Sequence, residues 1–126
     1  MISIIITSYK EPKTIGKAIE SFLKQKIREK YELIVSAPDR ETQDVVKKYV
    51  KKDKRVRLFK DPGKGKTLAI NLLLPRLKGA IIILTDGDVY VSSDSINKII
   101  DSFKDEKVGC ITGKPVSVNP RDNLFG

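Results

Sequence analysis

Two carboxylates stand two positions apart at the polar end of an apolar run. Asp86 and Asp88 flank Gly87, and they follow the four large apolar residues Ile81 to Leu84 and then Thr85. Nearby carboxylates repel each other unless a proton or a cation lies between them. With oxygen ligands only, the cation that suits them is Mg²⁺ or Mn²⁺, completed by water and a substrate phosphate. The pair therefore indicates a metal–phosphate site, and the alternative is a solvated turn, because Asp-Gly is a common turn pair.

The composition excludes several other chemistries. The 126 residues include 25 Lys and Arg against 16 Asp and Glu, no histidine, and a net charge of +9. The absence of histidine excludes a histidine base or metal ligand, and the single Cys110 excludes a disulfide framework and a cysteine zinc site. Cys110 lies in an apolar, strand-like stretch, so we expect a buried thiol in a reducing environment. The excess of lysine suits phosphate-rich substrates, nucleic acid or an anionic membrane surface.

The sequence shows no targeting or membrane-spanning pattern. Met1 leads straight into a strand pattern with no basic n-region or cleavage site. No apolar run approaches the roughly 18 residues that cross a membrane. We therefore expect a single cytoplasmic domain over residues 1–126. The lysine- and isoleucine-rich, glutamine-poor composition points to a thermophilic source.

Strands and helices alternate along the predicted chain. Apolar stretches that begin near residues 2, 31, 56, 80 and 107 predict strands. Helical stripes over 15–27, 45–50, 68–73 and 96–103 lie between or after them. The unbroken run 81–84 is typical of a strand buried on both faces, and strand spacing would put both carboxylates on the same side of the chain. This alternation predicts an α/β fold with a mainly parallel sheet covered by helices.

Polar residues follow the first four predicted strands, where each strand ends. Because the carboxyl ends of parallel strands meet at one edge of the sheet and ligands bind there, we expect these residues to form the site. They are Tyr9 and Glu11, Asp39 and Arg40, Lys64 and Lys66, and Asp86 and Asp88.

The turn Asp61 to Thr67 supports two interpretations. Its end, Gly65-Lys66-Thr67, follows a strand and precedes a helix, as in a phosphate-binding P-loop. The P-loop spacing requires a glycine at position 60, where the chain has Lys60. A P-loop-like nucleotidase therefore stays an alternative function for this turn. The interpretation without a function is a flexible cationic loop.

The motifs, taken in order, resemble those of family 2 glycosyltransferases of the GT-A fold, in their N-terminal, donor-binding half. The opening I-S-I-I-I-T-S-Y-K-E is similar to the first strand and loop of that family. Gly65 to Asn71 resembles its G-K-x-x-A-x-N helix start, and Asp86-Gly87-Asp88 falls where its D-x-D motif lies. Residues 108–114 and 123–126 are similar to its V-G-x-x-x-G-R strand and its N-L-F-G segment. The resemblance covers nearly the whole chain.

The resemblance implies a Rossmann-like, GT-A-type three-layer sandwich that binds a nucleotide-diphospho-sugar for inverting glycosyl transfer. The nucleotide would be held by Thr7, Tyr9 and Glu11, with Lys66 near the ribose or diphosphate. Asp86 would contact ribose or sugar, and Asp88 would hold the Mn²⁺ or Mg²⁺ that bridges the diphosphate. The family's second strand ends in Asp-Asp-Gly-Ser, whereas this chain has Ser36-Ala37-Pro38-Asp39, so the carboxylate that reads the base is absent or displaced to Asp39.

In the family, the acceptor site and the carboxylate general base lie further along the chain than Gly126. We therefore expect these 126 residues to be truncated relative to the family, to bind donor and metal, and to transfer sugar poorly on their own. Two arrangements are then open: a piece of a longer enzyme that associates with the cytoplasmic face of a membrane, or a short protein completed by a partner. A basic nucleic-acid-binding module is the remaining alternative, but the lysines are spread over several predicted helices and few aromatic residues are available for base stacking.

Overall fold

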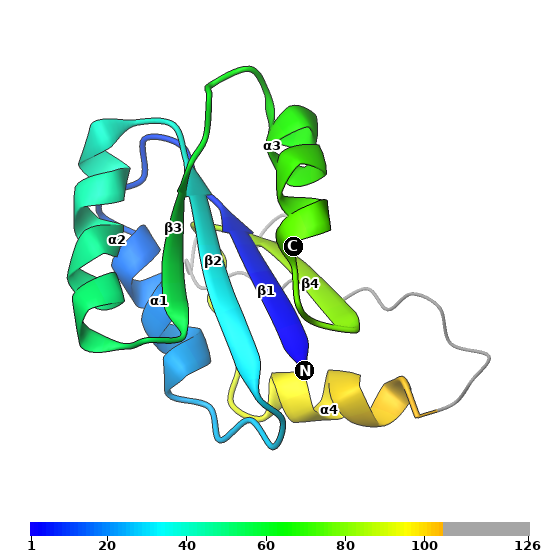
Figure 1. Ribbon diagram of the computed structural model, residues 1–126. Helices are drawn as coiled ribbons and strands as arrows, with labels where there is room; N and C mark the ends of the chain where they lie inside the picture. The colour runs from blue at the N-terminus through cyan, green and yellow to red at the C-terminus, as the bar shows by residue number, and fades with distance from the viewer. Residues whose placement is uncertain (105–126) are drawn as a thin grey trace, which may run out of the picture.

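The computed structural model describes residues 1–104 of the chain as an alternation of strands and helices (Figure 1). The elements are β1 (Ile2–Thr7), α1 (Ile15–Leu23), β2 (Tyr31–Ala37), α2 (Arg40–Lys52), β3 (Val56–Lys60), α3 (Lys66–Leu73), the 3₁₀ helix η1 (Leu74–Arg76), β4 (Ile81–Asp86) and α4 (Ser95–Ser102). All four expected strands that fall within this range are confirmed. The expected fifth strand, Cys110 and the motifs at 108–114 and 123–126 lie outside the described residues.

The four strands form one parallel sheet in the order β3-β2-β1-β4. The chain first moves outward from β1 to β3 and then returns across β1 to add β4 on the other side. Figure 1 shows α1 and α2 on one side of the sheet and α3 on the other. The reversal makes β1 and β4 neighbours at the switch point of the sheet, where α/β folds bind ligands. Thr7 and Asp86, the last residues of these two strands, are partners in the register.

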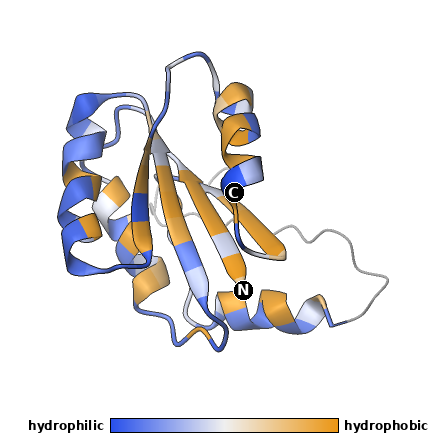
Figure 2. Cartoon of the chain, viewed as in Figure 1, coloured by the Kyte–Doolittle hydropathy of each residue, from blue (hydrophilic) through white to orange (hydrophobic). Residues whose placement is uncertain are grey.

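The larger core lies between the sheet and helices α1, α2 and α4. Every second residue of β1 points into it, as the period of a strand requires. Its fully or nearly fully buried members are Ile2, Ile4, Ile6, Ile15, Ile19, Phe22, Tyr31, Leu33, Val35, Val46, Val56, Ile96 and Ile100. Each large side chain buried in this way contributes roughly 1.5–3 kcal/mol. The outer surface of α2 is mostly hydrophilic, and hydrophobic residues run along β1 and β4 (Figure 2).

The core on the α3 side is smaller and leaves β4 partly uncovered. It consists of Ile5, Ile34 and Leu73, with Phe59 and Leu77 packed against it. The prediction that β4 is buried on both faces is wrong for the described residues. Ile81 and Ile83 pack against the larger core, but Ile82 and Leu84 on the α3 side are 42% and 53% exposed. The short α3 helix reaches β1 and β2 on this face and does not cover β4.

A buried carboxylate fixes the start of β4 against the sheet. Glu32 of β2 pairs with Arg57, and it accepts hydrogen bonds from the Ser3 hydroxyl at 2.6 Å and from the backbone N–H of Lys78 at 2.7 Å. The Ser3 hydroxyl also accepts from the N–H of Gly79 at 2.8 Å. A Cβ at Gly79 would lie 2.4 Å from the backbone nitrogen of Ser3, so no larger residue fits there. These contacts hold the register that places Asp86 opposite Thr7.

The end of α1 differs from expectation, and the end of α3 agrees with it. α1 ends at Leu23, so Ile27 lies in the loop that follows, where it still packs against the larger core. Pro75 ends α3, as expected, because the chain tightens there into η1. Across residues 1–104, none of the helices has both the length and the apolar character that a membrane crossing would need.

Candidate functional site

The loop after β1 is built so that one carboxylate organises its backbone. Glu11 Oε1 accepts hydrogen bonds from the Ser8 hydroxyl at 3.0 Å and from the Tyr9 N–H at 3.3 Å. Lys10, which lies between Tyr9 and Glu11, adopts a left-handed backbone conformation with φ of 53°. The tight turn leaves the Tyr9 side chain 60% exposed at the carboxyl edge of the sheet. An exposed aromatic ring at a strand end is available to contact a ligand.

Asp39 joins this loop to α2. Its carboxylate caps the helix by accepting the N–H of Thr42 at 3.1 Å and the Thr42 hydroxyl at 2.6 Å, and it also accepts the Lys10 N–H at 2.9 Å. Burial alone would raise the pKa of Asp39, but the hydrogen bonds from Thr42 and Lys10 outweigh it and hold that pKa below its ordinary value. The observed contacts give Asp39 a structural role, and its contact with a nucleotide base stays a prediction.

Asp86 and Lys66 form an ion pair across the switch point. Lys66 Nζ lies 2.7 Å from Asp86 Oδ1, and the Thr7 hydroxyl donates to the same oxygen at 3.1 Å. The Lys66 hydrogen bond, helped by the one from Thr7, lowers the pKa of the Asp86 carboxyl against a smaller opposing effect of burial. Both charged side chains are more than half exposed. Three predicted site residues from β1, α3 and β4 thus lie together in a place open to a ligand.

Asp88 lies in a different direction from Asp86. β4 ends at Asp86, and a turn follows in which Val89 N–H donates to the Asp86 carbonyl. Asp88 lines a hollow of about 460 Å³ together with residues 10–14 and Glu41, on the side of the sheet that carries α1 and α2. Asp86 instead meets Lys66 at the start of α3. The prediction that both carboxylates share one side is wrong, because the chain leaves the strand conformation after Asp86.

Gly87 is held tightly between the two carboxylates. Its N–H donates to the Thr7 carbonyl at 2.9 Å, which extends the β1–β4 pairing by one residue. A Cβ at this position would lie 2.3 Å from Ser8 Oγ and 3.0 Å from Glu11 Oε1. The glycine is therefore required by close contact with the β1 loop.

The hollow at Asp88 has ligand atoms that suit a hard divalent cation. The acidic residues Asp88, Glu11 and Glu41 line it, together with Lys10 and Lys13, whose charges would favour the phosphates of a ligand beside the metal. Within residues 1–104, no three His, Cys, Asp or Glu side chains are grouped closely enough to hold a metal by themselves. This arrangement fits Mg²⁺ or Mn²⁺ held by one or two carboxylates, with water and ligand phosphates completing the shell.

Several residues that build the site were not singled out from the sequence. Ser8 and Thr42 hold the loop after β1, and neither was given a role in the predicted site. Gln25 is a buried polar residue three positions after Phe22, on the continuation of the apolar stripe of α1. A polar side chain on an apolar stripe is the sequence signal that could have drawn attention to it.

The family model for glycosyl transferase family 2 matches residues 3–126 of the chain. Over 115 residues the chain is 29% identical to the uncharacterized glycosyltransferase EpsJ of Bacillus subtilis, covering 87% of this chain and 33% of that protein. It is 27% identical to the hyaluronan synthase of Pasteurella multocida, covering 99% of this chain and 13% of the synthase. The chain thus spans a third or less of the length of these curated relatives.

Solved structures share the same architecture. The mannosyltransferase PcManGT from Pyrobaculum calidifontis, in complex with GDP-Man and Mn²⁺, has a TM-score of 0.79 at 22% identity, with 98% of this chain and 37% of that chain covered. S. aureus TarS 1-349 in complex with UDP-GlcNAc has a TM-score of 0.65 at 25% identity, with 92% and 36% covered. The fold is that of a GT-A glycosyltransferase domain. The chain belongs to glycosyl transferase family 2.

Proposed function

We propose that the chain is the donor-binding part of an inverting glycosyltransferase and that it binds a nucleotide-diphospho-sugar with Mn²⁺ or Mg²⁺. The observation that carries the proposal is the placement of Asp88 beside residues 10–14, at the carboxyl edge of the strands where β1 and β4 meet. Membership of the family supports a sugar transfer, and the nucleotide sugars bound to PcManGT and TarS support the class of donor.

The chain offers groups of both signs to such a donor. Asp88 would hold the metal, which when bound supplies Lewis-acid stabilisation of the charge that grows on the departing diphosphate. Lys66 would face the ribose or diphosphate once it turns from Asp86, and Asp86 would then be open to ribose or sugar hydroxyls. Thr7, Tyr9, Glu11 and Asp39 would line the nucleotide from the loops after β1 and β2. The cytoplasmic location and thermophilic source expected from the composition stay predictions.

The P-loop alternative gains no support from the described loop. Lys66, the lysine that a P-loop would direct at phosphates, is the first residue of α3 and pairs with Asp86. No observation favours nucleic-acid binding either, because the exposed lysines extend over α1, α2 and the loops between them.

The first test is a calorimetric titration of the chain with UDP, GDP and their sugar conjugates, with and without Mn²⁺. We expect one nucleotide to bind more tightly when Mn²⁺ is present. Asp88→Ala should lower the metal affinity at least about 100-fold, because losing even an outer-shell partner of a metal lowers that affinity about 10- to 100-fold.

Asp44→Ala is the matched control, since Asp44 is an exposed carboxylate of α2 that only approaches Lys47 at 3.7 Å. It should bind metal and nucleotide as the wild type does. Equal metal affinity in Asp88→Ala and wild type would reject Asp88 as the ligand. No binding of any nucleotide by the wild type would reject the proposed function of this chain.

A further inference from the structure

The segment that carries Asp88 has little structure of its own. Residues 87–94 form neither helix nor strand, and most of their side chains are exposed. Within the segment the backbone closes only short turns, such as Val89 N–H to the Asp86 carbonyl and Ser95 N–H to the Ser92 carbonyl. A metal ligand must be held to within about 0.5 Å of its working position, so contacts from outside the segment are needed.

One such contact joins Gly87, next to Asp88, to the Thr7 carbonyl of β1 at 2.9 Å. The others come from α1 and from the residues just before and after it. Asp88 lies against residues 10–14 at the start of α1. The Val91 N–H donates to the Ser21 hydroxyl at 3.2 Å, two residues before the helix ends. The Ile96 N–H donates to Gln25 Oε1 at 3.1 Å, just beyond the helix. The segment therefore runs beside α1 from its beginning to its end.

The side chain of Gln25 caps the N-terminus of α4. Asp94, at the N-cap position, has a left-handed backbone with φ of 65° and makes no capping hydrogen bond with its side chain. The Ile96 N–H is among the first-turn donors that a cap normally satisfies. Gln25 satisfies it from another element, and its amide nitrogen donates to Ser95 Oγ at 3.2 Å and to the Ser21 carbonyl at 3.3 Å. Gln25 is buried, so water cannot replace it readily.

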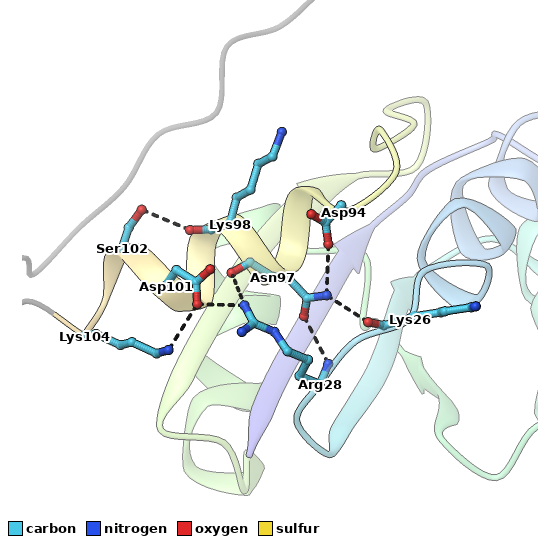
Figure 3. Close-up of polar contacts among 8 residues, drawn as sticks. All are labelled: Lys26, Arg28, Asp94, Asn97, Lys98, Asp101, Ser102 and Lys104. Carbon is cyan, nitrogen blue, oxygen red and sulfur yellow. Dashed lines mark hydrogen bonds and ion pairs between the residues drawn. The ribbon is translucent and has the colours of Figure 1, made fainter.

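A second, exposed set of contacts holds α4 itself and does not touch the segment before residue 94. Figure 3 shows Asn97 between the N–H of Arg28 and the carbonyl of Lys26, and Arg28 reaching Asp101 at 2.7 Å. Ile96 and Ile100 also pack in the larger core. α4 is thus anchored in several ways. In the described stretch between Asp88 and α4, Val91 packs against the larger core and its N–H is held by Ser21, and Gln25 follows at the first turn of α4.

We propose that Ser21 and Gln25 are positioning residues for Asp88, which hold the segment after β4 along α1 so that its carboxylate faces the loop after β1. The inference rests on the proposed function, because it concerns the metal ligand named there. Neither side chain contacts the hollow at Asp88, so both act through the backbone of residues 88–96.

The test compares hydroxyl and amide deletions on chain 1–126. Ser21→Ala removes the acceptor of Val91, and Ser102→Ala removes a comparable hydroxyl that bonds a carbonyl one turn earlier on α4. Gln25→Met removes the cap at similar side-chain length, and Arg28→Ala breaks only the exposed anchor of α4. Mn²⁺ affinity is measured by electron paramagnetic resonance with UDP or GDP present, and nucleotide affinity is measured without metal.

We expect Ser21→Ala to weaken Mn²⁺ binding by about 10-fold and Gln25→Met by up to about 100-fold, the range seen for outer-shell partners of metals. Nucleotide affinity without metal should stay at the wild-type value. Hydrogen exchange at the Val91 amide should accelerate in Ser21→Ala. Ser102→Ala and Arg28→Ala should leave both affinities unchanged.

Two outcomes would overturn the inference in distinguishable ways. If the wild type binds Mn²⁺ with the nucleotide and Ser21→Ala binds it equally well, the positioning role is wrong while the proposed function stands. If the wild type shows no metal-dependent binding, the proposed function fails and the inference fails with it. Should Gln25→Met not fold, Ser21→Ala decides alone, since it removes a single hydroxyl at a partly exposed position. That hydroxyl accepts from the Val91 N–H and donates to the Ala18 carbonyl, and Ser102→Ala controls for the loss of the second bond.

Discussion

At the scale of single residues, the two carboxylates of the site, Asp86 and Asp88, have different neighbours. Asp86 shares one oxygen with Lys66 and Thr7 in the described structure, whereas Asp88 lies in the hollow beside the start of α1. Two carboxylates that are near neighbours in sequence thus have separate surroundings. The arrangement lets Asp86 hold a cationic side chain, and Asp88 is the residue that we propose would hold a metal ion.

The Lys66–Asp86 pair predicts a pH dependence of stability. The folded-state pKa of Asp86 is lowered, so its contribution is fully present above its unfolded value, about 3.9, and is lost as pH falls through the folded value. Because the pair is exposed, it should contribute at most about 1 kcal/mol. Urea unfolding of wild type and Asp86→Asn from pH 7 to pH 2.5 measures this difference. A difference that stays constant below pH 4 would contradict the assignment.

At the scale of elements, β4 is fixed at both ends by glycines that have no room for a side chain. Gly79 abuts the backbone of Ser3, and Gly87 abuts the side chain of Ser8. The first contact sets the register of the strand, and the second joins its carboxyl end to the loop after β1. A methyl group added at Gly79 would therefore disturb the backbone of the sheet, whereas one added at Gly87 would disturb side chains of the site.

Gly79→Ala should destabilise the fold by about 1–3 kcal/mol, because backbone atoms cannot move aside cheaply. Gly87→Ala should act mainly on the site: it displaces Ser8 and Glu11 and weakens nucleotide binding with less effect on stability. Thermal unfolding and nucleotide titration separate the two effects. Adding Ser8→Gly to Gly87→Ala restores the space and should recover most of the binding. If it recovers none, steric contact with Ser8 is not the cause.

The elements were predictable from the sequence to different degrees. The strands were found because apolar runs bounded by polar turns mark them directly, as at Ile2–Thr7 and Tyr31–Ala37. The exposure of one face of β4 could not be predicted, because an apolar run does not reveal which neighbours cover it. Ile82 and Leu84 are exposed among the described residues. The direction of Asp88 depended on a turn whose geometry the Asp-Gly-Asp pattern does not specify.

The site was predictable as a set of residues at one edge of a sheet, but not as a set of contacts. Lys66 was expected to lie near a diphosphate, and the pairing with Asp86 was not foreseen because it joins α3 to β4 through the fold. The base-reading carboxylate was expected to be absent or displaced to Asp39, whereas the hydrogen bonds of Asp39 with Thr42 and Lys10 appear only when the loops are folded together. The roles assigned to these residues toward a donor stay predictions.

At the scale of the whole molecule, we expect binding without transfer. The chain spans 37% of the mannosyltransferase PcManGT, and the proposed function assigns no carboxylate of this chain the role of general base. The 126-residue chain should therefore bind its nucleotide sugar and release UDP or GDP from it no faster than buffer does. Chromatographic analysis of the nucleotide after prolonged incubation with Mn²⁺ checks this. Rapid release of nucleoside diphosphate would mean that the 126 residues already contain what the chemistry needs.

The bond from Lys10 to Asp39 also bears on how fast a ligand can associate. One carboxylate ties a left-handed residue of the loop after β1 to the first turn of α2, so the loop is ordered before any ligand arrives. A preorganised loop loses little further conformational entropy when it closes on a nucleotide. Association should then follow a single exponential whose rate rises linearly with nucleotide concentration, with no slow unimolecular phase after the encounter.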